Sequence, residues 1–190
     1  MITAKEFYLT WCDTIQHRND EVEQNWSNTK LTSLVIKNEN SIVVDISERL
    51  GLLCFNGDFH NIDSVFYREE DLIQEYSPGC YLTDIRIAFE HENDFYSGLF
   101  QEVSHLLLIN CDLKVVVSYP PSEKAEFSML EKLHSIISSS RISQHLADTD
   151  GFLFIMGHEE ANIWKGWVYK SDNWELVAEA NTIFSSKEQN

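Results

Sequence analysis

Two glutamates one residue apart, Glu90 and Glu92, are the side chains that point most clearly to chemistry in this sequence. They end an apolar run that begins at Ile85 and is typical of a buried strand. Side chains alternate across a strand, so both carboxylates should lie on the same face, where their like charges favour a bound cation. The pattern therefore predicts a metal site, and Mg²⁺ or Mn²⁺ is the ion that carboxylate oxygens would hold.

A third carboxylate, Asp63, is expected near the start of a short strand over Ile62–Tyr67. Asp58 is its rival for the same role, because an Asp near a strand start often only caps a turn. Asp84 has the parity of the two glutamates, but it lies about 20 Å upstream at roughly 3.3 Å per residue. We exclude it from the predicted site.

A divalent ion held by Asp63 and Glu90 could activate water and stabilise the charge that develops during phosphodiester hydrolysis. We expect the backbone carbonyl of His91 to complete the ligand set of Asp63, Glu90 and His91. Glu92 would bind the ion or accept the proton of the attacking water, so Asp63, Glu90 and Glu92 are the predicted catalytic residues. The ring of His91 has the opposite parity, which predicts a structural hydrogen bond. The alternative for the glutamates is a solvated strand end.

The elements that follow the glutamates should hold them in place. Leu99, Val103 and Leu106 give Ser97–Asn110 the spacing of a helix, and Leu113–Tyr119 is a Val-rich run typical of a strand covered on both faces. With a strand over Tyr81–Phe89, this order predicts a crossover between two parallel strands. The polar candidates on this helix, which face either the site or solvent, are Gln101, Glu102 and His105.

The rest of the chain predicts further elements of one α/β domain over residues 1–190, with a mixed central sheet flanked by helices. The core is expected at about residues 42–119, and a C-terminal helix and strands at 122–180. The expected elements are a helix over Thr3–Asn25, a hairpin of Leu31–Ile36 with Ser41–Ile46, a helix over Glu123–Ile137, and strands over Phe152–Met156, Trp164–Tyr169 and Trp174–Val177, with a frayed end from Ser185.

The order of these elements resembles the core of the PD-(D/E)xK nucleases, the superfamily that includes many restriction endonucleases. Asp63 matches the first acid of its motif and Glu90 the second, while Glu92 stands where the family usually has Lys, a variant known in a minority of active members. The resemblance covers about residues 42–119. It implies a restriction-endonuclease-like core, a Mg²⁺- or Mn²⁺-dependent hydrolase and a nucleic-acid substrate.

Composition and charge favour a different kind of partner. The formal net charge is −17, and eleven acids against two arginines between Asp58 and Glu102 supply more than half of it. Passive nucleic-acid binders usually carry a basic stripe instead. The charge is compatible with a non-catalytic protein, similar to an immunity protein or antitoxin, that covers a basic protein partner. A degenerate nuclease fold without activity is the third alternative.

The remaining motifs say little more about the function. The four cysteines show no C-x-x-C spacing, and neither a signal peptide nor an apolar run long enough for a membrane is evident, so we expect a cytoplasmic protein. No spacing predicts a zinc site. The stretch 164–170 could stack on bases with Lys165 and Lys170 as phosphate contacts, but a hairpin that covers the core with alternate aromatic side chains is the better interpretation.

Overall fold

The computed structural model describes residues 1–26, 30–76, 79–159 and 163–177. Its seven described strands form one mixed sheet in which they lie in chain order. β3 pairs with β4 and β4 with β5 in parallel, and the other pairs are antiparallel. This confirms the predicted α/β class with a mixed sheet. The strands are β1 (Leu53–Phe55), β2 (Ser64–Tyr67), β3 (Ile87–Glu92), β4 (Leu113–Ser118), β5 (Phe152–His158), β6 (Ile163–Tyr169) and β7 (Trp174–Leu176).

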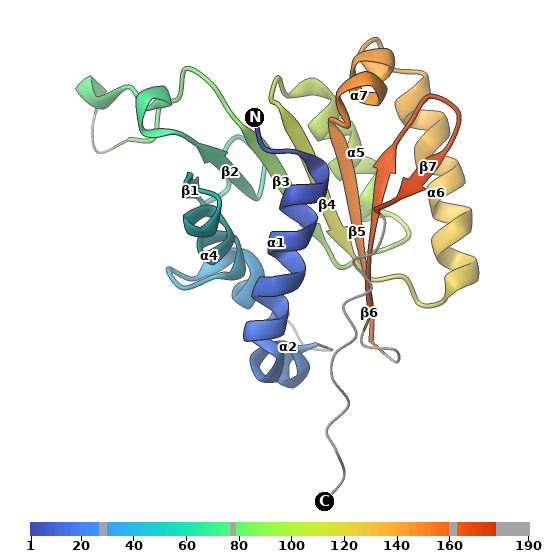
Figure 1. Cartoon of the computed structure of the whole chain (residues 1–190). Coiled ribbons are helices and arrows are strands. Elements are labelled where there is room, and N and C mark those ends of the chain that lie inside the picture. Colours follow the sequence, from blue (N-terminus) through green and yellow to red (C-terminus); the bar gives the residue numbers. More distant parts are fainter. Residues whose placement is uncertain (27–29, 77–78, 160–162, 178–190) are drawn as a thin grey trace, which may run out of the picture.

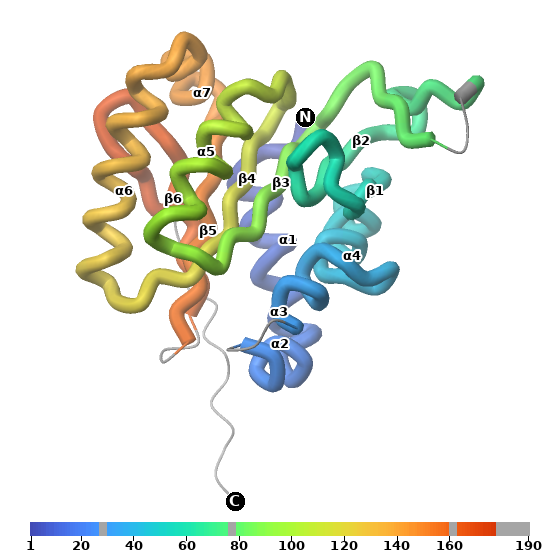
Figure 2. The backbone as a smooth tube through the Cα atoms, turned by 180° about the vertical axis from the view of Figure 1, so that it is seen from behind, coloured from blue at the N-terminus to red at the C-terminus, as the bar shows by residue number. Residues whose placement is uncertain are grey.

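Helices cover both faces of the sheet, which is the reason that its central strands are almost entirely buried. Figure 1 shows α1 and α4 in front of the sheet, and Figure 2 shows α5 and α6 on the opposite face. Each layer closes its own apolar core. The front group is α1 (Ala4–His17), α2 (Asn19–Asn25), α3 (Lys30–Thr32), a π-helical turn (Ser33–Lys37) and α4 (Ile42–Arg49); the back group is α5 (Gly98–Leu108), α6 (Glu123–Ser138) and α7 (Ser143–Thr149).

The predicted hairpin at residues 31–46 was wrong, because both of its β-branched runs are helical. Leu31, Leu34 and Val35 recur at helical spacing and are buried against α1 and the sheet, as are Ile42 and Ile46 of α4. β-Branched residues disfavour a helix only weakly, and burial of an apolar face outweighs that preference. The first predicted helix also breaks at Arg18, between α1 and α2.

The predicted strand over Tyr81–Phe89 begins only at Ile87. The described residues of the segment 68–86, which connects β2 to β3, instead project from the sheet as an arm with short 3₁₀ turns at Glu69–Asp71 and Gln74–Tyr76 (Figure 1). Asp71 is 4% exposed and accepts hydrogen bonds from both the Nε and Nη2 atoms of Arg86. This buried ion pair ties the two ends of the arm together.

The crossover was predicted correctly: β3 and β4 are parallel neighbours, and α5 connects them across the back face. In β3, Phe89 belongs to the front core and Ala88 to the back core. By this alternation Glu90 and Glu92 lie on the back face, beneath α5. The C-terminal strands were also predicted, whereas α7 was not, and the predicted frayed end from Ser185 lies outside the described residues.

Candidate metal centre

Glu90 is the buried centre of the site. It is 2% exposed on the back face of β3. Its Oε2 accepts a hydrogen bond of 3.2 Å from the backbone N–H of Asp63, whereas its Oε1 has no hydrogen-bond donor among the described residues. A buried carboxylate oxygen without a donor is costly, and such groups are normally paired with a donor or a cation.

Asp63 lies immediately before β2 and is fixed to β3 from the other direction. Its Oδ2 accepts a hydrogen bond of 2.8 Å from the backbone N–H of His91. Together with the bond from its own N–H to Glu90, this makes a reciprocal pair of contacts between the start of β2 and the end of β3. Asp63 and Glu90 also line one cavity, and their predicted roles as metal ligands stay predictions.

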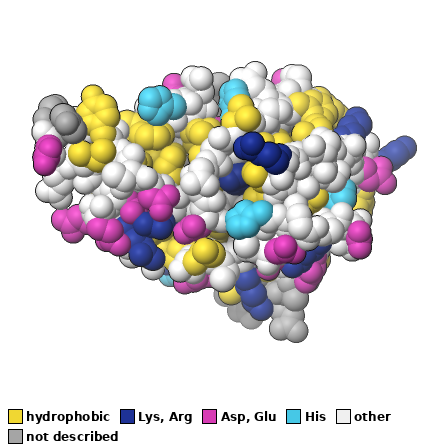
Figure 3. Space-filling model, turned by 90° about the horizontal axis from the view of Figure 1, so that it is seen from above, with side chains coloured by type: hydrophobic (Ala, Val, Ile, Leu, Met, Phe, Trp, Pro, Cys, Tyr) yellow, Lys and Arg dark blue, Asp and Glu magenta, His cyan; other side chains and the backbone are white. Residues whose placement is uncertain are grey.

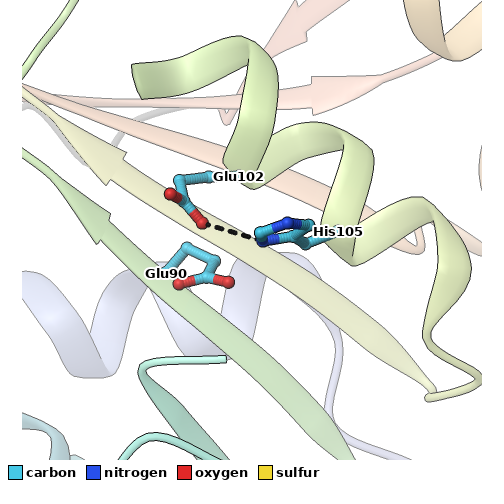
Figure 4. Close-up of side chains that lie close together, drawn as sticks. All are labelled: Glu90, Glu102 and His105. Carbon is cyan, nitrogen blue, oxygen red and sulfur yellow. Dashed lines mark ion pairs between the residues drawn. The ribbon is translucent and has the colours of Figure 1, made fainter. Parts of the chain in front are cut away.

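The helix α5 brings two further ligand side chains over Glu90. Ligand atoms of Glu90, Glu102 and His105 all lie within 4.8 Å of one another, close enough to share one ion (Figure 4). Nδ1 of His105 lies 3.4 Å from Oε2 of Glu102. The carboxylates and the imidazole open onto a cavity of about 440 Å³, which is lined by Asp58, Asn61, Asp63, Glu90, His91, Glu92, Gln101, Glu102 and His105.

The crowding of acids changes their protonation. Burial raises the pKa of Glu90 far above the ordinary carboxyl value, and the negative charges of Asp63 and Glu102 add to the effect. Burial also raises the pKa of Asp63, with the charges of Glu102 and Glu92 acting in the same direction. Burial and mutual repulsion thus favour protonation of these acids, and a divalent cation is another way of neutralising them.

Glu92 lines the same cavity but is held differently. Its Oε1 accepts a short hydrogen bond of 2.6 Å from the backbone N–H of Asp94. Its carboxyl group packs against Gly98, the first residue of α5, at a place where a Cβ atom would collide with it. Burial raises the pKa of Glu92 as well. The glycine thus gives Glu92 the room it needs beside the helix.

The ring of His91 lies away from the acids, as its parity in β3 predicted. Its Nε2 atom is 2.7 Å from the hydroxyl oxygen of Tyr119, and the ring packs against Tyr119 at 5.4 Å between centroids. Burial lowers the pKa of the imidazole to about 3, so the ring is neutral. The expected role of the His91 carbonyl as a metal ligand stays a prediction. Lys165 is bound to Glu123 and Glu126, and Lys170 to Asp150.

Sequence reasoning named Glu102 and His105 only as polar residues of the following helix, and left open whether they face the site. Their spacing of three residues places both on one face of α5. The missing information was the rotation of α5 about its axis, which is set by the burial of Leu99, Val103 and Leu106 on the stripe beside Glu102 and His105. That stripe was visible in the sequence and could have oriented the helix.

No family model, no curated protein and no solved structure matches this chain. Among the described residues, no helix has the length and apolar character needed to cross a membrane.

Proposed function

We propose that this protein is a divalent-metal-dependent, nuclease-like hydrolase of phosphodiester bonds in nucleic acid. The observation that carries the proposal is the carboxylate of Glu90. It is buried, one of its oxygens lacks a donor among the described residues, and that carboxylate faces Glu102 and His105 (Figure 4). A cation between these groups would supply the missing partner and relieve the repulsion.

The chain's own side chains suggest a division of roles. Asp63, Glu90, Glu102 and His105 would hold the ion, which would polarise the phosphate and lower the pKa of a bound water. Glu92 lies at the edge of the same cavity, and its raised pKa suits a group that takes the proton from that water.

The arrangement of the elements supports the nuclease interpretation. A helix on one face, three antiparallel strands β1, β2 and β3, a crossover helix and a parallel strand β4 follow one another in the order of the PD-(D/E)xK core. In this interpretation Asp63 and Glu90 would take the two acidic positions of that motif. Glu92 replaces the usual Lys, and the described residues that line the cavity include neither Lys nor Arg.

The ligand atoms favour Mn²⁺ over Mg²⁺ as the tighter-binding ion. Mg²⁺ prefers oxygen ligands and retains its water, whereas an imidazole such as that of His105 suits the later divalent metals. Both ions remain compatible with three carboxylates.

Calorimetric titration with Mn²⁺ and Mg²⁺ tests the metal site. We expect the wild-type protein to bind Mn²⁺ at or below millimolar concentration. Glu90→Gln should lose at least about tenfold in Mn²⁺ affinity, because mutating even a residue that only hydrogen-bonds to a metal ligand typically costs that much. Glu131→Gln removes the same charge from an exposed position on α6 and should bind as the wild type does. Equal binding by all three proteins, or none by the wild type, would overturn the proposal.

Hydrolysis is tested separately, with single-stranded and duplex DNA and RNA in the presence of Mn²⁺. We expect cleavage by the wild type and its loss in both Asp63→Asn and Glu92→Gln. Cleavage that survives in these variants would mean that a contaminant or another site is responsible.

The second candidate is a non-catalytic acidic protein that binds a basic protein partner, and the arm at residues 68–86 favours it. The arm exposes Glu69, Glu70 and Glu75, and Tyr81 is 55% exposed. Seen from above, acidic side chains gather at the end of the molecule where the arm projects (Figure 3). Metal binding without hydrolysis of any nucleic acid would favour this candidate.

A further inference from the structure

The turn at residues 58–61 has an unusual backbone. Among the described residues, four non-glycine residues have positive φ, and three of them lie here: Asp58 at 60°, His60 at 53° and Asn61 at 68°; the fourth is Asp150. Left-handed backbone is tolerated by Asn and Asp but is unfavourable for most side chains. Strain of this kind persists only where the surrounding structure enforces it, and it concentrates at functional sites.

Several hydrogen bonds hold the turn closed. Oδ1 of Asp58 accepts a hydrogen bond of 2.9 Å from the backbone N–H of Asn61. Phe59 and Ile62 exchange backbone hydrogen bonds of 2.8 and 3.0 Å, and Ile62 is fully buried. The turn is thus anchored directly before Asp63, and its Asp58 and Asn61 line the cavity of the metal centre.

The cavity has a shortage of groups that can bind an anion. Its lining contains the carboxylates of Asp58, Asp63, Glu90, Glu92 and Glu102, which repel a phosphodiester. The side-chain amide of Asn61 is an uncharged donor on this wall, and no described residue accepts a hydrogen bond from it. An amide donor that lines the cavity beside the proposed ion site can bind a phosphate oxygen without adding negative charge.

We propose that Asn61 is a substrate-positioning residue, whose side-chain amide donates a hydrogen bond to a non-bridging oxygen of the phosphodiester at the metal centre. This inference rests on the proposed function. The hydrogen bonds of the turn hold the backbone of Asn61 in place beside the cavity, so binding has to order only the exposed side chain of Asn61 and no flexible loop.

Two glycine variants separate the side chain from the backbone. Asn61→Gly and His60→Gly each place glycine at a left-handed position and relieve the same kind of strain. Only Asn61 lines the cavity, so His60→Gly is the matched control. A third variant, Asn61→Asp, keeps the size and the tolerance of left-handed backbone but replaces the donor with a carboxylate.

The measurement is calorimetric titration, first with Mn²⁺ and then, at saturating Mn²⁺, with the dinucleotide thymidylyl-3′,5′-thymidine. Every protein in this comparison, including the reference with wild-type residues 60 and 61, also carries Glu92→Gln, so that the dinucleotide is bound without being cleaved. We expect Asn61→Gly to bind the dinucleotide about tenfold more weakly, the loss of one hydrogen bond to a charged group. Asn61→Asp should bind it more weakly still. His60→Gly should match the wild type, and all three variants should bind Mn²⁺ at least as tightly as the wild type does.

The outcomes distinguish this inference from the function on which it rests. If the wild type binds no Mn²⁺, the proposed function and the role of Asn61 both fail. If Mn²⁺ binds and Asn61→Gly retains full affinity for the dinucleotide, the role of Asn61 alone is overturned. Equal losses in Asn61→Gly and His60→Gly would assign the effect to the backbone of the turn and would also overturn it.

Discussion

At the scale of single residues, Glu90 lowers the stability of the fold and is also the central side chain of the proposed metal site. A carboxyl group with one unpartnered oxygen destabilises the ion-free fold. The alternation of β3 made its position predictable, and Asp63 was matched with it through the resemblance to the PD-(D/E)xK motif. The left-handed turn at 58–61 could not be predicted, because its strained positions hold Asp, His and Asn instead of glycine.

Glu90→Gln should stabilise the ion-free protein at alkaline pH. Burial raises the pKa of Glu90 in the folded state, so the folded protein binds a proton more tightly than the unfolded chain does. The stability from this proton is fully present below the ordinary carboxyl pKa and is lost as the pH rises above it. Gln stays neutral and can still accept the Asp63 N–H, so we expect a gain of about 1 to 3 kcal/mol at pH 8.

Urea denaturation of both proteins in the presence of a chelator, at pH 5 and pH 8, measures this difference. The gain should shrink toward pH 5, near the ordinary carboxyl pKa, where the unfolded wild-type chain also begins to hold this proton. A variant that is less stable at both pH values would show that the Glu90 charge is satisfied by contacts within the protein, contrary to the proposed metal site.

At the scale of elements, the site depends on how α5 sits on β3. The spacing of Leu99, Val103 and Leu106 predicted the helix and its buried stripe, and the crossover followed from the order of the elements. The hairpin predicted at residues 31–46 failed because its β-branched residues are buried on helical faces. Neighbouring elements decide between strand and helix there, and a local preference of a few tenths of a kcal/mol cannot.

Gly98→Ala should change the site without weakening the helix. A Cβ atom at this position would meet the carboxyl group of Glu92, the flexible end of a side chain that can rotate away. Alanine favours the helix by up to about 1 kcal/mol relative to glycine, so thermal stability should hold or rise. We expect hydrolysis to fall about as far as in Glu92→Gln, while Mn²⁺ affinity changes little.

Cleavage assays and thermal denaturation of Gly98→Ala, beside Glu92→Gln, check this prediction. Full activity in Gly98→Ala would show that the position of Glu92 next to α5 is not needed for the reaction. A large loss of stability would show instead that the close approach of Glu92 and Gly98 matters for packing.

At the scale of the whole molecule, the net charge of −17 makes the folded state repel itself. Buried ion pairs offset part of this locally. Glu126 is fully buried and accepts hydrogen bonds from Lys165 at 3.0 Å and Trp167 at 2.7 Å, which joins α6 to β6. The ion pair of Asp71 and Arg86 joins two parts of the arm in the same way. The unpaired acids elsewhere leave the chain sensitive to dissolved ions.

Salt should therefore raise the thermal midpoint, and Mn²⁺ should raise it further than NaCl of equal ionic strength. Screening acts on all exposed charges, whereas a bound ion stabilises the folded state by mass action. We expect the extra effect of Mn²⁺ to disappear in Glu90→Gln and the effect of NaCl to remain. If the Mn²⁺ effect persists in that variant, the ion binds elsewhere on the acidic surface.

The order of the strands in the sheet has a consequence for how the protein is made. Each described strand pairs with the one that precedes it in the chain, so the sheet can grow from its β1 edge during synthesis as residues leave the ribosome. All the acids of the proposed metal centre, and His105, lie in the first 105 residues. The residues proposed to hold the ion are therefore all synthesised before β4, β5, β6 and β7.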